Sequence, residues 1–198
     1  MSANTKLPYT VVFPTAQRLV AALRPYCDRI EIAGSLRRQR PAIGDIELVA
    51  LPRPRLNLFG EDIKGPNPLE VFLADKGIQF TKYGDRYKQF QYGRHTVDLF
   101  LPTPATWGSI FTIRTGSWQF SKWLVTPQAA GGAAPESVTF NGGRLHAHGR
   151  RLATAEEIDV FHALGLAYID PADRHGPMPD APRIAPVWNF EEAPAPAA

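Results

Sequence analysis

The most informative part of the chain is residues 29–51, which read RIEIAGSLRRQRPAIGDIELVAL. Apolar and polar residues alternate over 29–33 and again over 45–51, and this period of two is typical of strands. A Gly-Ser pair directly follows the first strand, and we expect a short helix over 35–39. The stretch therefore predicts a strand, a tight turn into a helix, and a second strand.

The second strand carries two carboxylates, Asp45 and Glu47, which project from one face because they are two residues apart. Burying two carboxylates side by side is costly unless a cation or hydrogen bonds compensate. A third carboxylate, Asp98, lies among apolar neighbours in a predicted strand over 95–101. Oxygen ligands of this kind suit Mg²⁺, and three carboxylates allow two ions to assist phosphoryl transfer. The three residues are therefore candidate metal ligands and catalytic residues.

The turn at Gly34-Ser35 is a candidate anion site. At a helix N-terminus the backbone amides and the helix dipole favour an anion, and glycine lets a phosphate approach the backbone closely. Arg37 and Arg38 follow one turn later and can neutralise more phosphate charge. Carboxylates, cations and an anion cradle together predict a site for a metal-bound nucleoside triphosphate.

Patterns elsewhere complete a mixed α and β fold. We expect a hairpin over 79–92, strands over 137–148, and helices over 14–24, 69–76, 107–124 (broken near 115–117) and 154–164, the last opened by a capping box of Thr154 and Glu157. The prediction is an α+β protein with a mixed sheet and packed helices over residues 1–126. A smaller α/β lobe would span 136–176, and a disordered tail rich in proline and alanine would span 177–198.

Composition limits the classes of protein that this chain can represent. Of its 198 residues, 44% are hydrophobic and 21% are charged, as in globular domains, so wholesale disorder is excluded. The single cysteine, Cys27, excludes a disulfide framework and a cysteine-based zinc cluster. There is no apolar run of membrane-spanning length and no signal-peptide core, so we expect no membrane partner and a cytoplasmic location. The net charge of +3 permits an anionic partner.

The motifs and their order resemble the polymerase-beta-type nucleotidyltransferase superfamily, and more specifically the family X DNA polymerases. The resemblance covers residues 14 to 175. It rests on Gly34-Ser35, Gly44-Asp45-Ile46-Glu47, Val97-Asp98-Leu99, Trp107-Gly108-Ser109, Thr115-Gly116-Ser117 and the stretch 164–174. It implies that the sheet domain is a nucleotidyltransferase palm and that the C-terminal lobe is thumb-like.

The resemblance also implies roles for individual residues. Asp45, Glu47 and Asp98 correspond to the metal-binding triad, and Asp98 would also assist deprotonation of the attacking 3′-hydroxyl. The resemblance implies two Mg²⁺ ions, and Mn²⁺ is an alternative because Glu47 stands where the family usually has aspartate. The candidate nucleotide-binding residues are Gly34, Ser35, Arg38, Arg114, Thr115, Gly116, Ser117, Trp118 and Ser121.

Basic residues gather in two zones, over 37–94 and 144–151, which could flank a polyanion. The candidate nucleic-acid contacts are Lys88, Arg144, Arg150 and Arg151. Two alternatives stay open here. Lys88 either contacts DNA or lies on a solvated strand face, and Trp118 either stacks on a base or belongs to the core.

We therefore expect a DNA-directed DNA polymerase of family X type that acts in repair or gap filling. It would transfer a nucleoside monophosphate from a triphosphate to the 3′-hydroxyl of a primer or gapped DNA, release pyrophosphate, and act as a monomer. One alternative is a template-independent nucleotidyltransferase that acts on nucleic-acid ends, a protein or a small molecule. Another is a non-catalytic module that binds DNA ends. Because the sequence starts close to the palm, lyase activity is not expected.

Overall fold

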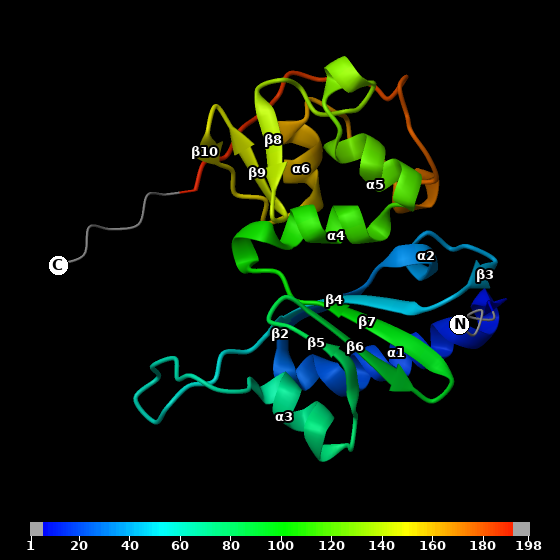
Figure 1. The fold of residues 1–198 in the computed structure, drawn as a ribbon, viewed down its shortest axis with the longest axis vertical. Helices are drawn as coiled ribbons and strands as arrows, with labels where there is room; N and C mark the ends of the chain where they lie inside the picture. Colours follow the sequence, from blue (N-terminus) through cyan, green and yellow to red (C-terminus); the bar gives the residue numbers. More distant parts are fainter. Residues whose placement is uncertain (1–5, 192–198) are drawn as a thin grey trace. The chain divides into compact units, whose positions relative to one another are not determined.

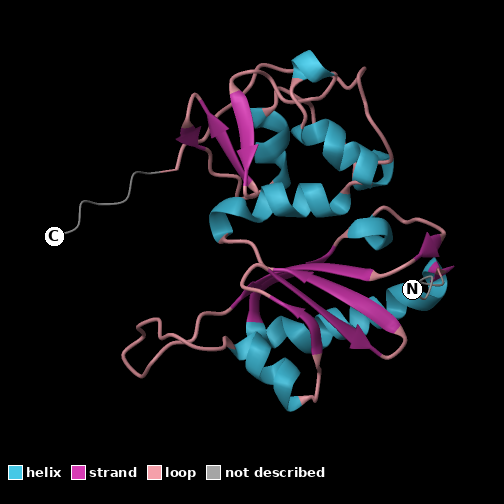
Figure 2. Cartoon of the chain, viewed as in Figure 1, coloured by secondary structure: helices cyan, strands magenta, loops and turns pink. Residues whose placement is uncertain are grey.

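The computed structural model describes residues 6–191, whose helices and strands form two units, one ending at Pro102 and the other beginning at Thr103 (Figures 1 and 2). Each unit has its own hydrophobic core. The predicted class, a mixed α and β protein with helices packed on a mixed sheet, is confirmed.

The first unit is built on a five-stranded mixed sheet in the order β2-β4-β7-β6-β5. Its strands are β2 (Cys27–Ile32), β4 (Ile46–Pro52), β5 (Phe80–Tyr83), β6 (Tyr87–Tyr92) and β7 (His95–Phe100). Strands β4 and β7 run parallel, whereas the other neighbours are antiparallel. The short strands β1 (Leu7–Pro8) and β3 (Ala42–Ile43) pair with each other.

Three α-helices accompany this sheet, namely α1 (Tyr9–Leu23), α2 (Gly34–Arg37) and α3 (Pro68–Asp75), together with the 3₁₀ turn η1 (Arg24–Tyr26). Helix α1 begins five residues before the predicted start at Pro14, because Val12 continues the apolar face that buries Ala16 and Leu19. Helix α3 starts with a capping box between Asn67 and Glu70.

The second unit combines helices with a small antiparallel sheet in the order β10-β9-β8. Its strands are β8 (Val138–Asn141), β9 (Arg144–Ala147) and β10 (Arg150–Arg151). Its helices are α4 (Trp107–Thr115), α5 (Trp118–Val125) and α6 (Glu157–Ala163), with the 3₁₀ turns η2 (Pro104–Thr106), η3 (Gln128–Ala130) and η4 (Pro171–Asp173). The break between α4 and α5 falls at the predicted Thr-Gly-Ser.

The division between the units lies at Pro102–Thr103, whereas the predicted boundary lies between residues 126 and 136. Helix α5 was expected in the first domain, but its residues Phe120 and Leu124 share a core with Phe161 of α6. The amphipathic face of α5 is visible in the sequence, but the partner that covers this face is not.

The predicted disorder of residues 177–198 does not extend to 177–191. Ala181 is buried, Trp188 and Phe190 pack against the core of the second unit, and Phe190 forms a bridge with Leu152. The remaining part of the predicted tail, residues 192–198, lies outside the described residues.

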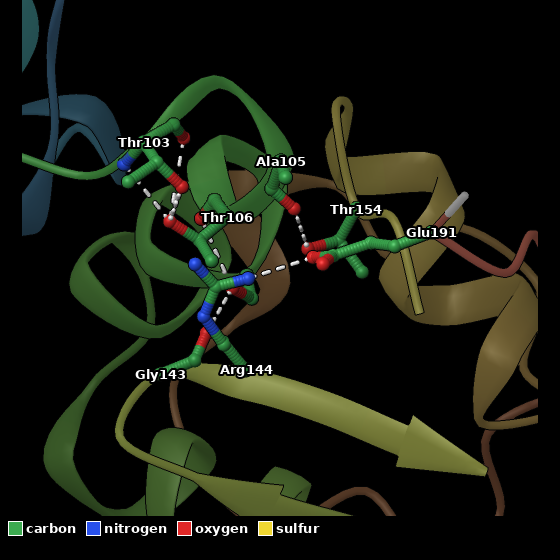
Figure 3. Close-up of polar contacts among 8 residues, drawn as sticks. Thr103, Ala105, Thr106, Gly143, Arg144, Thr154 and Glu191 are labelled. Atoms are coloured by element: carbon green, nitrogen blue, oxygen red, sulfur yellow. Dashed lines mark hydrogen bonds and ion pairs between the residues drawn. The ribbon is translucent and has the colours of Figure 1, made fainter. Parts of the chain in front are cut away.

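The start of α6 also differs from the prediction. Its N-terminal cap is Glu156, which forms a capping box with Asp159, in place of the predicted box of Thr154 and Glu157. The Thr154 hydroxyl donates instead to the carbonyl of Ala105, at 3.1 Å (Figure 3). Its side chain thereby connects two loops of the second unit.

Candidate active site

Two of the three predicted carboxylates are direct neighbours on parallel strands. Glu47 of β4 and Asp98 of β7 are register partners, and Asp45 lies one residue before β4. Partners in neighbouring strands project from the same face of a sheet. All three side chains are partly buried. The backbone therefore carries these carboxylates to one region of the first unit.

The electrostatics of Asp45 reflect this proximity. The pKa of Asp45 is raised above its ordinary value, first by burial and second by the negative charge of Asp98. The positive charges of Arg38 and Lys6 act in the opposite direction. Asp45 and Asp98 are thus close enough to repel each other in a partly dehydrated setting, and a divalent cation would relieve that repulsion.

Two residues of β6 fix one oxygen of Asp98. Its Oδ1 atom accepts hydrogen bonds from the Tyr87 hydroxyl and from Gln89 Nε2, the latter at 2.8 Å. Gln89 is the register partner of Asp98, and the Tyr87 ring stacks on Phe100. These two positioning residues were not predicted. The hairpin register could have identified them, because Tyr87 and Gln89 are two residues apart and share a face with Asp98.

The predicted anion turn lies directly against the Glu47 carboxylate. Gly34 has a φ of +61°, and a Cβ atom at this position would overlap the carboxylate of Glu47. The amide of Ala33 donates to the Glu47 carbonyl at 2.8 Å, which ties the turn to β4. Only glycine satisfies both the backbone conformation and the close approach. Ser35, the next residue, is partly buried at the same turn.

Arg38 is the cation of this cluster. Burial lowers the pKa of its guanidinium, while the charges of Glu47 and Asp45 raise it. Arg38 therefore lies within electrostatic reach of both carboxylates. Its amide donates to the Gly34 carbonyl at 3.1 Å, so the arginine follows the turn by one helical step.

The three carboxylates supply oxygen ligands of the type that a hard divalent cation prefers. Within residues 6–191, no three His, Cys, Asp or Glu side chains are already arranged to hold a metal ion. One oxygen of Asp98 is directed to Tyr87 and Gln89, and the Glu47 carboxylate lies against Gly34. The three carboxylates are nevertheless the ligand type of Mg²⁺ or Mn²⁺. The pKa of Asp45 is raised first by burial and second by the charge of Asp98, and a cation would offset both.

The predicted nucleotide-binding residues from 114 to 121 lie in the second unit, at the turn between α4 and α5. The Ser117 hydroxyl accepts from the Phe120 amide at 3.1 Å and donates to the His175 carbonyl at 2.6 Å. The Ser121 hydroxyl donates to the Ile113 carbonyl at 2.6 Å. Thr115 is buried, and a Cβ atom on Gly116 would overlap the Phe120 ring. Both serine hydroxyls thus hold the turn in shape.

Trp118 and Arg114 are the exposed members of that group. Trp118 is 72% exposed, so the alternative that it belongs to the core is wrong. The ammonium of Lys122 lies 5.2 Å from its ring centroid. Trp118, Lys122 and Trp123 line a pocket of about 300 Å³. An exposed indole beside a structured turn is suited to stacking on a planar group.

The prediction for Lys88 is wrong, because this residue is neither a DNA contact nor part of a solvated face. It is 1% exposed, and its ammonium forms an ion pair with Glu70 at 2.7 Å. The same ammonium donates to the Gly84 carbonyl and lies 3.8 Å from the centroid of the Tyr83 ring. Lys88 therefore joins β6 to α3 inside the first unit.

The three arginines predicted to bind nucleic acid lie on β9 and β10 of the second unit. Arg144 donates to the Glu191 carboxylate at 2.7 Å (Figure 3), and the Arg150 guanidinium lies 4.0 Å from the centroid of the Phe190 ring. Arg150 and Arg151 are exposed. The segment ending at Glu191 thus pairs with part of this basic surface.

A buried ion pair supports the α4–α5 turn, and it was not predicted. Arg174 is fully buried; it donates to Glu157 at 2.6 Å and twice to the Ile169 carbonyl. The main-chain carbonyl of Arg174 accepts from the Ser117 amide at 2.9 Å. The only sequence signal was that Arg174 ends the stretch 164–174.

The site residues thus fall into two sets. Gly34, Ser35, Arg38, Asp45, Glu47 and Asp98 come together in the first unit, whereas residues 114–121 and the three arginines belong to the second. Comparison of the sequence with protein-family models and with curated proteins gives no match. Across residues 6–191, the helices are all too short or too polar to cross a membrane.

Proposed function

We propose that this chain is a metal-dependent nucleotidyltransferase that adds nucleoside monophosphates to the 3′-end of DNA, as family X DNA polymerases do. The observation that carries the proposal is the register of Glu47 and Asp98 on parallel strands, with the Gly34 turn against the Glu47 carboxylate. An anion-binding turn and clustered carboxylates are both needed to hold a metal-bound triphosphate.

Each residue of the first-unit site has a role in this proposal. The amides of the Gly34-Ser35 turn and the Arg38 guanidinium would bind the triphosphate oxygens. Asp45, Glu47 and Asp98 would hold two divalent ions, which supply charge neutralisation at the attacking and leaving oxygens. Asp98 would also hold the proton of the attacking 3′-hydroxyl. Tyr87 and Gln89 would orient Asp98 for this role.

Two features of the second unit, taken by themselves, also suit contacts with a nucleotide or with DNA. Trp118 presents an indole to solvent beside a turn that Ser117 and Ser121 hold in shape. Base stacking on an aromatic side chain contributes about 1–3 kcal/mol and tolerates any base. The exposed Arg150 and Arg151 would contact backbone phosphates.

The test is incorporation of nucleotides into a labelled primer, supplied alone or annealed to a gapped template, with Mg²⁺ or Mn²⁺. We expect extension by the base that the template specifies. Tailing of the primer alone would instead indicate a template-independent transferase. Binding of DNA with full affinity in a chelator, with no incorporation of any nucleotide, would contradict the proposal and identify a DNA-binding module.

The matched variants are Asp98→Asn and Asp85→Asn. Asp98 lies in the carboxylate cluster, whereas Asp85 is exposed in the turn between β5 and β6. We expect the Asp98 variant to lose extension by about 10³-fold or more while it retains the circular dichroism spectrum of the original chain and melts at no lower temperature. The Asp85 variant should keep full activity. Normal turnover in the Asp98 variant would refute the assigned role.

A further inference from the structure

Residues 53–67 form an arm that projects from the first unit between β4 and α3 (Figure 1). The two sides of the arm are hydrogen bonded to each other. The amide of Asn57 donates to Glu61 at 2.9 Å, the amide of Ile63 donates to Arg55 at 2.8 Å, and Leu56 forms an antiparallel bridge with Asp62. The arm is therefore a structured hairpin.

The tip of the arm presents two large apolar side chains. Leu58 is 101% exposed and Phe59 is 87% exposed. The Asn57 side chain accepts hydrogen bonds from the amides of Phe59 and Glu61, both at 2.9 Å, and Gly60 completes the turn with a φ of +80°. The tip is thus built to hold two apolar groups in water, which is unfavourable unless a partner covers them.

A pocket of about 400 Å³ lies at the base of the same arm. It is formed by apolar side chains, with Arg55 and Asp75 as its charged members, and its apolar lining consists of Tyr26, Pro66, Pro68, Val71 and Phe72. Tyr26 and Phe72 stack with their ring centroids 4.4 Å apart, and Val71 is 43% exposed. This volume is in the range of sites that accept small apolar groups.

The charges of the arm are separated along its length. Glu61 and Asp62 lie next to the tip, whereas Arg53, Arg55 and Lys64 lie nearer the base. Acidic residues beside the tip would repel the phosphates of a nucleic acid or of an anionic membrane. The charge pattern therefore favours a protein partner whose own surface is basic next to an apolar pocket.

We propose that the partner is a second copy of this chain. Each arm measures about 15–17 Å from tip to base, the length of five extended residues. When two arms lie antiparallel, these equal lengths let both tips reach the opposite base at the same time. Each tip then reaches the pocket of the other copy, and each acidic distal half meets a basic base. This self-complementary contact closes around a two-fold axis.

The interface is small, so the dimer is reversible. Two tips and two pockets bury on the order of 1,000 Å² in total, near the lower limit of specific interfaces. We therefore expect a micromolar dissociation constant. The proposal replaces the monomer expected from the sequence, and it is independent of the proposed enzymatic function.

The experiment is sedimentation velocity of the whole chain from about 2 to 200 μM. We expect a concentration-dependent monomer–dimer equilibrium that is lost in Leu58→Ser/Phe59→Ser and in Val71→Asp. The matched control, Val11→Ser, changes an exposed apolar residue on α1 and should dimerise normally. A monomer at every concentration, or a dimer that the tip variant leaves unchanged, would overturn the proposal. Monomeric protein that binds phosphatidylserine vesicles through Leu58 and Phe59 would overturn it in favour of a membrane.

Charge reversal tests the antiparallel arrangement with two further variants, Asp62→Lys and Lys64→Glu. Each variant alone places like charges opposite each other and should weaken dimerisation about threefold or more. An equimolar mixture of the two variants should form a heterodimer with close to the original affinity. In that heterodimer the more basic arm of one variant faces the more acidic arm of the other, so opposite charges meet again. Equal dimerisation of the single variants and the mixture would refute the antiparallel contact.

Discussion

Each unit holds a cluster of charged side chains away from full solvent, and the two clusters are built in opposite ways. In the second unit, Nη1 of Arg174 lies 2.6 Å from Oε1 of Glu157, so opposite charges compensate each other. In the first unit, Asp45, Glu47 and Asp98 gather like charges on one region of a sheet, and the pKa of Asp45 is raised. A compensated ion pair of this kind stabilises the fold. A concentration of like charge costs stability; Arg38 offsets part of it here, and the proposed metal ions would offset more.

The largest effect should come from breaking the compensated pair. Arg174→Met leaves Glu157 buried without its arginine and removes the two bonds to the Ile169 carbonyl, so we expect a loss of about 3–5 kcal/mol in the free energy of unfolding. Urea denaturation measures this loss. Arg151→Met, an exposed arginine of the same unit, should change stability by less than about 0.5 kcal/mol. A similar small loss for Arg174→Met would show that the pair is not stabilising.

The second prediction concerns the ion pair of Lys88 and Glu70 in the first unit. Burial raises the pKa of Glu70, but hydrogen bonds from Lys88, the Asn67 amide and Tyr83 lower it more, so the net shift is downward. A lowered pKa in the folded state stabilises the chain at pH values above 4.5, the ordinary pKa of glutamate. This contribution is lost as the pH falls through the folded pKa.

Lys88→Met should therefore destabilise the chain at pH 7 by about 3 kcal/mol and reduce the dependence of stability on pH below 4.5. Unfolding curves from pH 3 to pH 7 measure both effects. Lys82→Met, an exposed lysine on β5, is the control. An unchanged pH profile in the Lys88 variant would contradict the assigned ion pair.

The third prediction concerns the repulsion between Asp45 and Asp98 in the first unit. Burial is the first cause of the raised pKa of Asp45 and the charge of Asp98 is the second, so Asp98→Asn should lower that pKa part of the way towards its ordinary value. Because a raised carboxyl pKa costs stability as the pH rises, the variant should be slightly more stable at pH 7. Carboxyl-carbon NMR of Asp45 measures the shift without any metal. An unchanged pKa would mean that the two carboxylates do not interact.

The smallest effect is expected at the edge of the second-unit sheet. Glu191→Gln weakens the ion pair with Arg144 and makes that guanidinium available to a phosphate. We expect DNA affinity to rise about two- to fivefold, with a steeper dependence on salt. Fluorescence anisotropy with labelled DNA measures both. Weaker binding would show that Glu191 orients Arg144 productively.

The sequence predicted the local elements well because their signals are local. Alternation marked the strand that carries Glu47, and apolar spacing marked the helix that buries Ala16 and Leu19. The position of Asp98 beside Glu47 depends on pairing between strands that are about fifty residues apart in sequence. It was expected from the resemblance to a known family, and neither strand alone encodes it.

Long-range partners explain what the sequence did not reveal. Lys88 shares one face of β6 with Phe90, and both side chains are buried, whereas Lys88 was expected on a solvated face or in contact with DNA. The acid that makes this burial possible, Glu70, lies on a separate helix. The same holds for Arg174, whose partner Glu157 lies seventeen residues earlier.

The exposure of Trp118 gives the chain an intrinsic optical reporter. Trp107 and Trp123 are nearly inaccessible, and the Trp188 indole donates to the Ala163 carbonyl, whereas 72% of the Trp118 surface is in contact with water. Iodide or acrylamide should therefore quench the emission of Trp118 before that of Trp107 and Trp123. The nucleotide binding proposed above would be seen on the unlabelled protein as a loss of that quenchable fraction.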